Sequence, residues 1–411
     1  MTTDLTFFTN EPGATLLDRF KRTLSDVKYF DILVGYFRTS GFHQLYDALE
    51  TVDHIRILVG LTVDQKAFEL IEVETGTNHA ITPQFTPVKS LNPPYPDIPA
   101  LVKQYGQALS PSAIQGADWM LTSSGSADIF KKMQQVGMSL EKYINGQIYR
   151  GVLTGCNQAF VIDSTQRANL INEDIKNANI IKPLIIGDDT RKWNIKNEGK
   201  KWLLFIPWHF PLHQETSISG VSLKAEQEFC TQFPAIYNHL SNFKSQLSAR
   251  NKAETGIRYE WYALQRCAAT YWQEFEKPKI IFPEICKEPR FTFDRSGVFT
   301  NNKAFIIPLD DLYLLGILNS ACAWEYTKLI CSSLGDENKG GRLMLQWVNF
   351  KKLPIPPASP ADKARIETLV QQCLTAQGQA VAATEAEIDD IVTRLYGLTE
   401  AERAIIQGRE G

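Results

Sequence analysis

Apolar residues recur with two different periods along the first 75 residues. Two segments have the spacing of helices, and two are continuous apolar runs typical of buried strands; in chain order these are Leu16–Val27 (helix), Tyr29–Tyr36 (strand), Ser40–Leu49 (helix) and Ile55–Leu61 (strand). Strand, helix and strand in succession favour a parallel pair. The pattern therefore predicts a small β-α-β unit over residues 1–75.

Residues 76–116 are polar and proline-rich, which is typical of a linker. A longer mixed α/β domain is predicted over 117–357. Its expected strands are Tyr149–Leu153, Gln158–Ile162, Lys201–Ile206, Lys279–Phe282, Phe291–Phe293 and Ala304–Pro308. Its expected helices are Ser126–Val136, Glu226–Lys244 and Asp311–Leu329. The predicted fold class is α+β, or mixed α/β.

The last segment, 358–411, reads as a helical hairpin. Ser359 and Pro360 form an N-cap and first helical position, and Thr384–Glu387 resembles a capping box. Gly397 is placed to end that second helix, and Thr399–Glu402 to begin a third. These amphipathic helices must cover an apolar face. They either pack on their own domain or contact another subunit, including a second copy of this chain.

Composition narrows the class of protein. At 411 residues the chain is long enough for two or three domains. No window reaches the roughly 18 consecutive apolar residues of a membrane helix, and the N-terminus lacks the pattern of a signal peptide. The seven cysteines are scattered and form no CxxC pair, so no structural metal site or disulfide framework is expected. A reducing cytoplasm is the expected location, with no membrane partner.

Charge is distributed unevenly around a total of −3. Residues 359–411 hold nine acidic and five basic side chains, or −4, so the remaining residues carry +1. Between Arg191 and Trp202 five cations face one acid. Because phosphate contacts are screened within about 8–10 Å, local clusters matter more than the total. A basic surface for nucleic acid is compatible with this distribution.

Several ordered sequence blocks carry a family resemblance. They are "IYRGVLTGCNQAFVID" (148–163), "IIKPLIIGDDTRKW" (180–193), "FEKPKIIFPEI" (275–285), "YLLGILNSACAW" (313–324), "LPIPP" (353–357) and "IDDIVTRLYGLTEAE" (388–402). Over about 119–405 the chain resembles the TaqI-like C-terminal specificity (target-recognition) domain of type IIG restriction-modification enzymes. The resemblance implies docking on duplex DNA. The resemblance also implies that the family's catalytic modules, which use S-adenosylmethionine and Mg²⁺, lie outside this segment. No cofactor is assigned to this chain.

The N-terminal segment, about 5–75, resembles part of a phospholipase D-like domain through "FDILVGYFRTSGFHQLYDAL" and "IRILVGL". That superfamily uses an HxKxxxxD motif, but no histidine here is followed two positions later by lysine. A structural or docking role is therefore expected for this segment.

Hydrogen-bonding and cationic side chains in the specificity region are candidates for DNA contact. Asparagine pairs with adenine, arginine with guanine and an acid with the cytosine amino group, while threonine can meet a thymine methyl. Lysines position the protein on phosphates. The predicted contact residues are Arg150, Thr154, Asn157, Lys182, Asp189, Arg191, Lys192, Lys196, Lys200, Lys201, Lys277, Lys279, Lys303, Lys339 and Arg342. Two β-turns with side-chain caps would explain the glycine-rich parts equally well.

Two weak motifs suggest chemistry. Asn92-Pro93-Pro94-Tyr95 matches the motif of adenine amino-methyltransferases, but no buried strand precedes it, which favours a linker. Asp188 with Glu198 and Lys200 imitates the D…ExK pattern of metal-dependent nucleases. The alternatives to a DNA-recognition module are thus an active DNA methyltransferase or endonuclease, and a non-catalytic scaffold built on the phospholipase D-like half and the helical hairpin.

Overall fold

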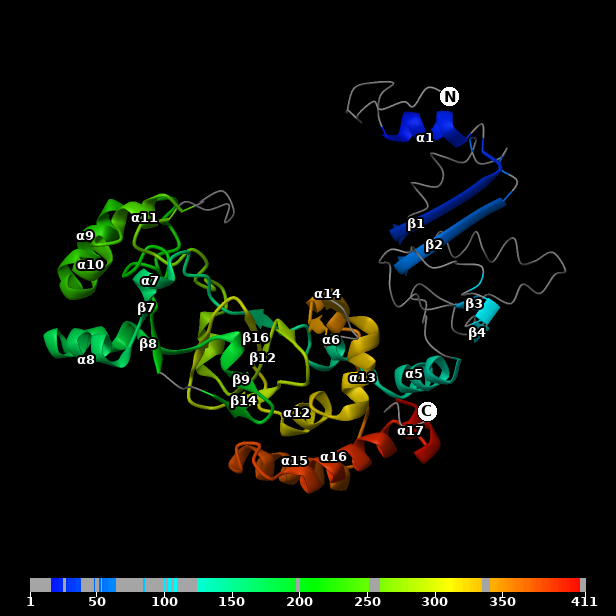
Figure 1. The fold of residues 1–411 in the computed structure, drawn as a ribbon. Coiled ribbons are helices and arrows are strands. Elements are labelled where there is room, and N and C mark those ends of the chain that lie inside the picture. The colour runs from blue at the N-terminus through cyan, green and yellow to red at the C-terminus, as the bar shows by residue number, and fades with distance from the viewer. Residues whose placement is uncertain are drawn as a thin grey trace. The chain divides into compact units, whose positions relative to one another are not determined.

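A computed structural model provides the structure of this chain. It describes residues 16–24, 27–37, 48, 52, 54–63, 84–85, 100, 103–104, 107–108, 124–196, 200–250, 259–334 and 341–406. The chain divides into two compact units, residues 1–131 and 132–411 (Figure 1). Within the described residues, every helix is too short or too polar to cross a membrane.

The first unit contains the predicted parallel strand pair. After helix α1 (Leu16–Leu24), strands β1 (Tyr29–Phe37) and β2 (His54–Val63) run parallel, with Tyr29 opposite His54. The predicted strands and their orientation are confirmed. The helix expected at 40–49 lies, apart from residue 48, outside the described residues. Strands β3 (Gln84–Phe85) and β4 (Gln107–Ala108) form a short antiparallel pair in the predicted linker.

The second unit is built on two four-stranded sheets. The first has the order β15 (Phe299–Thr300), β8 (Ile181–Ile185), β11 (Lys201–Leu204), β7 (Val161–Ile162), and only its β15–β8 pair is parallel. The second is antiparallel throughout, in the order β14 (Thr292–Asp294), β12 (Lys279–Pro283), β16 (Ala304–Ile307), β6 (Tyr149–Arg150). The predicted mixed α/β class is confirmed.

Smaller strand groups complete this unit. A three-stranded sheet has the order β13 (Ile285–Cys286), β18 (Arg342–Met344), β17 (Ser332–Leu334). Strand β5 (Met138–Ser139) pairs with β19 (Pro354–Ile355), and β9 (Thr190–Arg191) with β10 (Asn194–Ile195). The latter pair is a tight hairpin whose turn is Lys192-Trp193.

Most helices of this unit surround the strands (Figure 1). Helix α5 (Ser124–Val136) spans the boundary between the two units. The helices between it and strand β12 are α6 (Leu140–Tyr143), α7 (Asn157–Phe160), α8 (Ser164–Glu173), η2 (Ile175–Ile180), η3 (Gly187–Asp189), α9 (Leu223–Gln232), α10 (Pro234–Ser241), α11 (Lys244–Ser248) and η5 (Trp272–Glu276). Those after β12 are α12 (Leu312–Leu318), α13 (Ala321–Ile330), α14 (Trp347–Phe350), α15 (Pro360–Thr375), α16 (Ala382–Leu395) and α17 (Glu400–Ile406).

Three predicted elements differ in the structure for local reasons. The expected strand at 158–162 begins as the helical turn α7, and only its last two residues pair as β7. The helix expected over 226–244 is broken before Pro234, which cannot donate a backbone hydrogen bond and instead starts α10. The helix expected over 311–329 ends at Asn319, because the side chain of Ser320 caps a new helix.

The C-terminal helices pack on their own domain. Helix α15 contacts α12 and α16, and α16 contacts α13. A Cβ added to Gly316 of α12 would lie 2.6 Å from a methyl carbon of Ile366, so glycine permits this close approach. Ser359 caps α15 as predicted, and Gly397 has the expected positive φ of 69°. The capping box predicted at Thr384–Glu387 is wrong, since those residues lie inside α16.

Candidate nucleic-acid interface

The glycine-rich segment after β6 brings two distant parts of the chain together. A Cβ added to Gly151 would lie 2.0 Å from the carbonyl oxygen of Asn301. Gly155 has a φ of 73°, a conformation that L side chains rarely adopt. The segment that follows β6 therefore lies against the residues that precede β16.

Thr154 and Asn157 occupy this turn and contact each other. The Thr154 hydroxyl donates to the Asn157 Oδ1 at 2.6 Å, and Thr154 is only 5% exposed, whereas Asn157 is exposed. The Arg250 guanidinium donates to the Thr154 carbonyl at 2.8 Å, and burial lowers the pKa of Arg250. In this conformation Asn157 reaches the surface and the Thr154 side chain supports it.

Arg150 of β6 pairs with an acid, Glu284, that the sequence reasoning missed. Its Nη2 donates to Glu284 Oε1 at 2.6 Å, and its Nε donates to the carbonyl of Asn302 at 2.8 Å. Lys303 Nζ lies 3.6 Å from the other carboxylate oxygen of Glu284. Glu284 is thus held between two predicted DNA-contact residues. The sequence did not single out this acid, because it stands alone among apolar residues in "FPEI".

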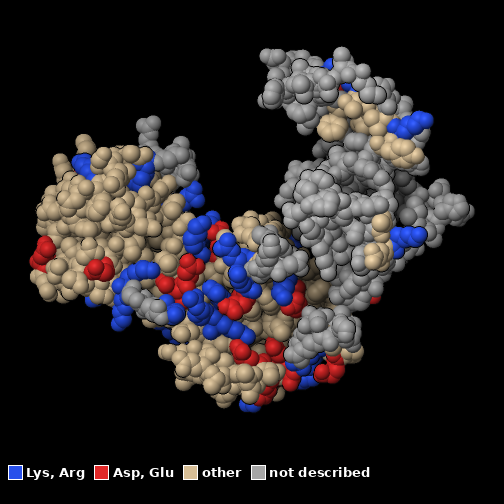
Figure 2. Space-filling view, in the orientation of Figure 1, with Lys and Arg blue, Asp and Glu red and all other residues tan. Residues whose placement is uncertain are grey.

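A pocket of about 340 Å³ opens beside this ion-pair group. It is lined by Ile186, Gly187, Asp188, Pro283, Glu284, Ile285, Cys286, Lys287, Arg290, Asn301, Lys303 and Arg342. Four of these side chains are cationic and two are acidic, which leaves a formal charge of +2. Lysines, arginines and acids mix over this part of the second unit, around β9, β12, β14 and β16 (Figure 2). The pocket brings together the predicted Asp188, Lys303 and Arg342.

Cys286 contributes no reactive thiolate to this pocket. Burial raises the pKa of its thiol to about 12, so the neutral thiol persists at neutral pH. Lys287 and Arg290, which sequence reasoning also missed, add charge to the wall. Their signal was the short basic run "CKEPR", which falls between two strands and is too brief to stand out.

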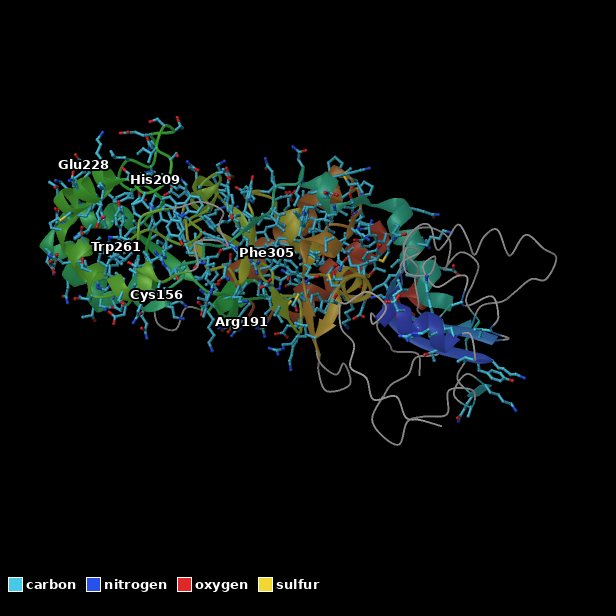
Figure 3. The ribbon with its side chains drawn as sticks, turned by 90° about the horizontal axis from the view of Figure 1, so that it is seen from above. Cys156, Arg191, His209, Glu228, Trp261 and Phe305 are labelled. Atoms are coloured by element: carbon cyan, nitrogen blue, oxygen red, sulfur yellow. The ribbon has the colours of Figure 1, made fainter. Side chains whose placement is uncertain are left out.

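Gly187, Asp188 and Asp189 form the short helix η3. The Asp189 carboxylate accepts a hydrogen bond of 2.8 Å from the backbone N–H of Ile186, so it shapes the turn. Arg191 lies at the edge of the second unit in Figure 3, and its guanidinium donates to the carbonyl of Asp188 at 2.6 Å. Asp188 itself is exposed.

The remaining basic candidates differ in accessibility. Lys277 has 57% side-chain exposure, and its Nζ lies 2.7 Å from Glu274. Lys182 pairs with Glu276 at 2.8 Å, and Lys192 with Glu385 at 2.7 Å. Lys196 and Lys200 are exposed, whereas Lys201 is half-buried.

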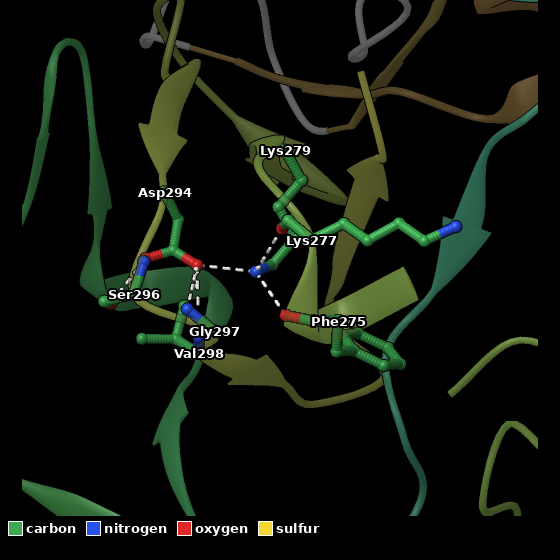
Figure 4. Close-up of polar contacts among 7 residues, drawn as sticks. All are labelled: Phe275, Lys277, Lys279, Asp294, Ser296, Gly297 and Val298. Carbon is green, nitrogen blue, oxygen red and sulfur yellow. Dashed lines mark hydrogen bonds and ion pairs between the residues drawn. The ribbon is translucent and has the colours of Figure 1, made fainter. Parts of the chain in front are cut away.

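Lys279 lies in the core rather than on a surface. Its Nζ donates to Asp294 Oδ2 and to the carbonyl of Phe275, each at 2.5 Å (Figure 4). Asp294 also accepts hydrogen bonds from the backbone N–H groups of Ser296, Gly297 and Val298. Burial alone would raise the pKa of Asp294, but Lys279 and these donors bring it below its ordinary value. This buried pair joins β12 to β14, and we leave Lys279 out of the proposed contact surface.

Several aromatic residues of this unit belong to its core. Trp193, Tyr259, Trp261 and Tyr262 are all buried. Trp261 and His209 lie among α9, α10 and the neighbouring loops (Figure 3). The His209 Nδ1 contacts the buried carboxylate of Glu260 at 2.8 Å, which is a structural role.

The candidates for catalysis lie largely outside the described residues. Asn92, Tyr95, Glu198 and the DNA-contact candidate Lys339 fall there, so their roles stay predictions. Among the residues that are described, no group of three or more His, Cys, Asp or Glu side chains could hold a metal ion. Asp188 and Lys200 are exposed, but neither contributes to such a group.

The second unit is thus a mixed α/β fold with a pocket whose lining residues include four cations and two acids. Residues 182–355 match the model of the TaqI-like C-terminal specificity domain, which confirms the predicted resemblance over this segment. This segment includes every residue that lines the pocket, and the second sheet apart from β6.

Three known proteins are similar to this chain over part of its length. The type II methyltransferase M.MjaIV of Methanocaldococcus jannaschii is 25% identical over 250 residues, which are 59% of this chain and 76% of that protein. Two solved structures are similar in part. The type IIL restriction-modification enzyme MmeI, solved in complex with DNA, gives a TM-score of 0.45 at 12% identity, over 64% of this chain and 35% of that one. The type IIG restriction endonuclease BpuSI gives 0.37 at 13% identity, over 68% of this chain and 34% of that one. The chain therefore spans about a third of the length of either enzyme.

Proposed function

We propose that this chain binds duplex DNA sequence-specifically, as the target-recognition module of a type IIG-like restriction-modification system. The specificity-domain match at 182–355 and the named methyltransferase relative support this function. The observation that carries it is the pocket, to which two segments that hold most predicted contact residues, 149–202 and 277–342, both contribute. Asp188 reaches it from one region, and Lys303 and Arg342 from the other.

The distribution of charge suits such a role. Lys303 is 63% exposed in its side chain, and Arg342 is exposed at the start of β18. Cations at a pocket rim can contact phosphates, which fixes the register of the protein on the duplex. Polar groups deeper in the pocket can then contact base edges. The proposed contact surface consists of Arg150, Asn157, Lys182, Arg191, Lys192, Lys196, Lys200, Lys201, Lys277, Lys303 and Arg342, with Thr154 and Asp189 holding its turns.

The catalytic steps would belong to another module or chain. A methyltransferase partner would supply S-adenosylmethionine chemistry and a nuclease partner Mg²⁺ chemistry, in the bacterial cytoplasm where the target DNA lies. A second copy of this chain is the other candidate partner. Methyl transfer from labelled S-adenosylmethionine, or Mg²⁺-dependent cleavage by the purified chain alone, would assign the catalysis to this chain instead.

Selection from a randomised duplex library, followed by sequencing, tests the recognition. The full chain is used at low and moderate salt without cofactor. We expect an enriched motif, and an affinity that falls steeply with salt because counterions leave the phosphates. Equal affinity for the enriched duplex and a scrambled one would overturn the proposal.

Variants of Lys303 and Arg342, the exposed cations at the pocket rim, sharpen this test. Lys303→Ala and Arg342→Ala should weaken binding to all duplexes alike, and each should reduce the logarithmic salt slope by about one. Lys363→Ala is the matched control, because this lysine is 47% exposed on α15, outside the pocket walls. A slope that stays unchanged in both rim variants would remove these residues from the interface.

A further inference from the structure

The pocket has a carboxylate where a simple phosphate site would have only cations. Glu284 lies between β12 and β13, and its side chain is 15% exposed. Its backbone is fixed on both sides, since its N–H donates to the Lys303 carbonyl and its carbonyl accepts from Leu345 N–H, each at 2.8 Å. The carboxylate is therefore presented to the pocket from a rigid segment.

The two oxygens of Glu284 are occupied unequally. Oε1 accepts the 2.6 Å hydrogen bond from Arg150. Oε2 lies 3.6 Å from Lys303 Nζ, an ion-pair distance that is longer than a good hydrogen bond. A carboxylate has about four lone-pair sites, so Glu284 keeps acceptor capacity beside the pocket.

A phosphate is the wrong ligand for this oxygen. Two anions a few ångströms apart repel, and a carboxylate without a proton cannot donate to a phosphate. A group that carries N–H donors is complementary to it. The edges of DNA bases offer such donors in the exocyclic amino groups of cytosine and adenine, and acidic side chains accept from the cytosine amino group in the major groove.

We propose that Glu284 is a specificity-determining residue that accepts a hydrogen bond from the exocyclic amino group of one base in the target sequence. Arg150 and Lys303 orient its carboxylate, while Lys303 and Arg342 also face the backbone phosphates at the rim. The pocket of about 340 Å³ is large enough to receive a base edge. This inference rests on the proposed DNA recognition.

Glu284→Gln tests the proposal in the same library selection. Glutamine keeps the length and can still accept from Arg150, but it removes the negative charge. We expect the preference for cytosine or adenine at one position to fall about 5- to 150-fold, with the remaining positions unchanged. The position that changes identifies the base. Glu288→Gln is the matched control, because Glu288 is 63% exposed and pairs with Arg290 nearby.

Glu284→Asp covers the case in which Glu284→Gln does not fold. It keeps the charge between Arg150 and Lys303 but withdraws the carboxylate by one methylene, so the same position should lose part of its preference. A duplex whose selected base lacks the amino group should bind the wild-type chain and a folded Glu284 variant equally.

The outcomes separate the two proposals. If the wild-type chain selects a motif and folded Glu284 variants select the same one, the role of Glu284 is overturned while DNA recognition stands. A uniform gain in affinity for all duplexes with an unchanged motif would mark the pocket as a phosphate site, which also overturns it. A wild-type chain that selects no motif overturns the proposed function itself.

Discussion

The indole Nε1 of Trp193 donates a hydrogen bond of 2.6 Å to Oε1 of Glu385. The same oxygen lies 2.7 Å from Nζ of Lys192. Trp193 has a φ of 66° and is buried, so the β9–β10 turn is fixed to helix α16 although about 190 residues separate them in sequence. The C-terminal helices thus support the loop that carries Arg191, Lys192 and Lys196.

Replacing Glu385 should therefore loosen this loop. We expect Glu385→Ala to lower the free energy of unfolding by about 1–3 kcal/mol, because the Trp193 N–H loses its partner away from water. Glu387→Ala is the control. Its ion pair with Arg365 is exposed, and such pairs contribute about 0–1 kcal/mol. Denaturant unfolding monitored by tryptophan fluorescence measures both, and equal losses would contradict the assigned role.

The buried pair of Lys279 and Asp294 should be costly to break. Lys279→Met removes one partner and leaves the Asp294 carboxylate uncompensated among buried strands, which typically costs about 3–5 kcal/mol. Lys277→Met, two residues earlier and exposed, should change stability by less than about 1 kcal/mol. Thermal and denaturant unfolding of the two variants compares the loss of a buried lysine with the loss of an exposed lysine two residues away.

Low pH should lower the free energy of unfolding through the same pair, Lys279 and Asp294. The pKa of Asp294 lies below its ordinary value in the fold, so its ionised form contributes stability that is fully present above the unfolded pKa of about 3.9. That contribution is lost as pH falls through the lower folded value. The free energy of unfolding of Asp294→Asn should consequently decline less steeply than that of the wild-type chain below about pH 4. Parallel slopes would argue that other acids govern acid unfolding.

A methyl group at position 316 should disturb the contact between α12 and α15. Its carbon would lie 2.6 Å from a methyl carbon of Ile366 and 3.0 Å from one of Val370. Overpacking of this kind costs about 1–3 kcal/mol. An open helix position would give the opposite sign, because alanine is favoured over glycine by about 1 kcal/mol. In the double variant Gly316→Ala, Ile366→Ala the combined loss should be smaller than the sum of the two single losses.

Much of the fold could be predicted because short-range patterns determine it. The runs Tyr29–Tyr36 and Ile55–Leu61 form a parallel pair, and Ser359 caps a helix where its hydroxyl stands three residues before an acid. Helices that extended across a break were predicted less well. At Pro234 a missing backbone donor starts a new helix, and at Ser320 a side-chain cap does so. Apolar periodicity continues through both breaks and conceals them.

Two of the four cations that line the pocket were predictable from the sequence, but the assembly of the pocket was not. Lys303 and Arg342 follow from their type and neighbourhood, yet Lys279, only three residues after the glutamate at 276, is buried by the pairing of β12 with β14. Glu284 could not be found from sequence, since an isolated acid among apolar residues carries no signal. Its place in the site becomes visible only in the fold, where Arg150 of β6 and Lys303, just before β16, both approach its carboxylate.

The pocket walls come from four stretches of chain, at 186–188, 283–290, 301–303 and 342. An exchange of one of these stretches with a relative would place unmatched residues against the other three. A change that keeps the pocket walls matched is therefore either a single substitution within the walls or an exchange of the whole 182–355 segment, which contains all four stretches.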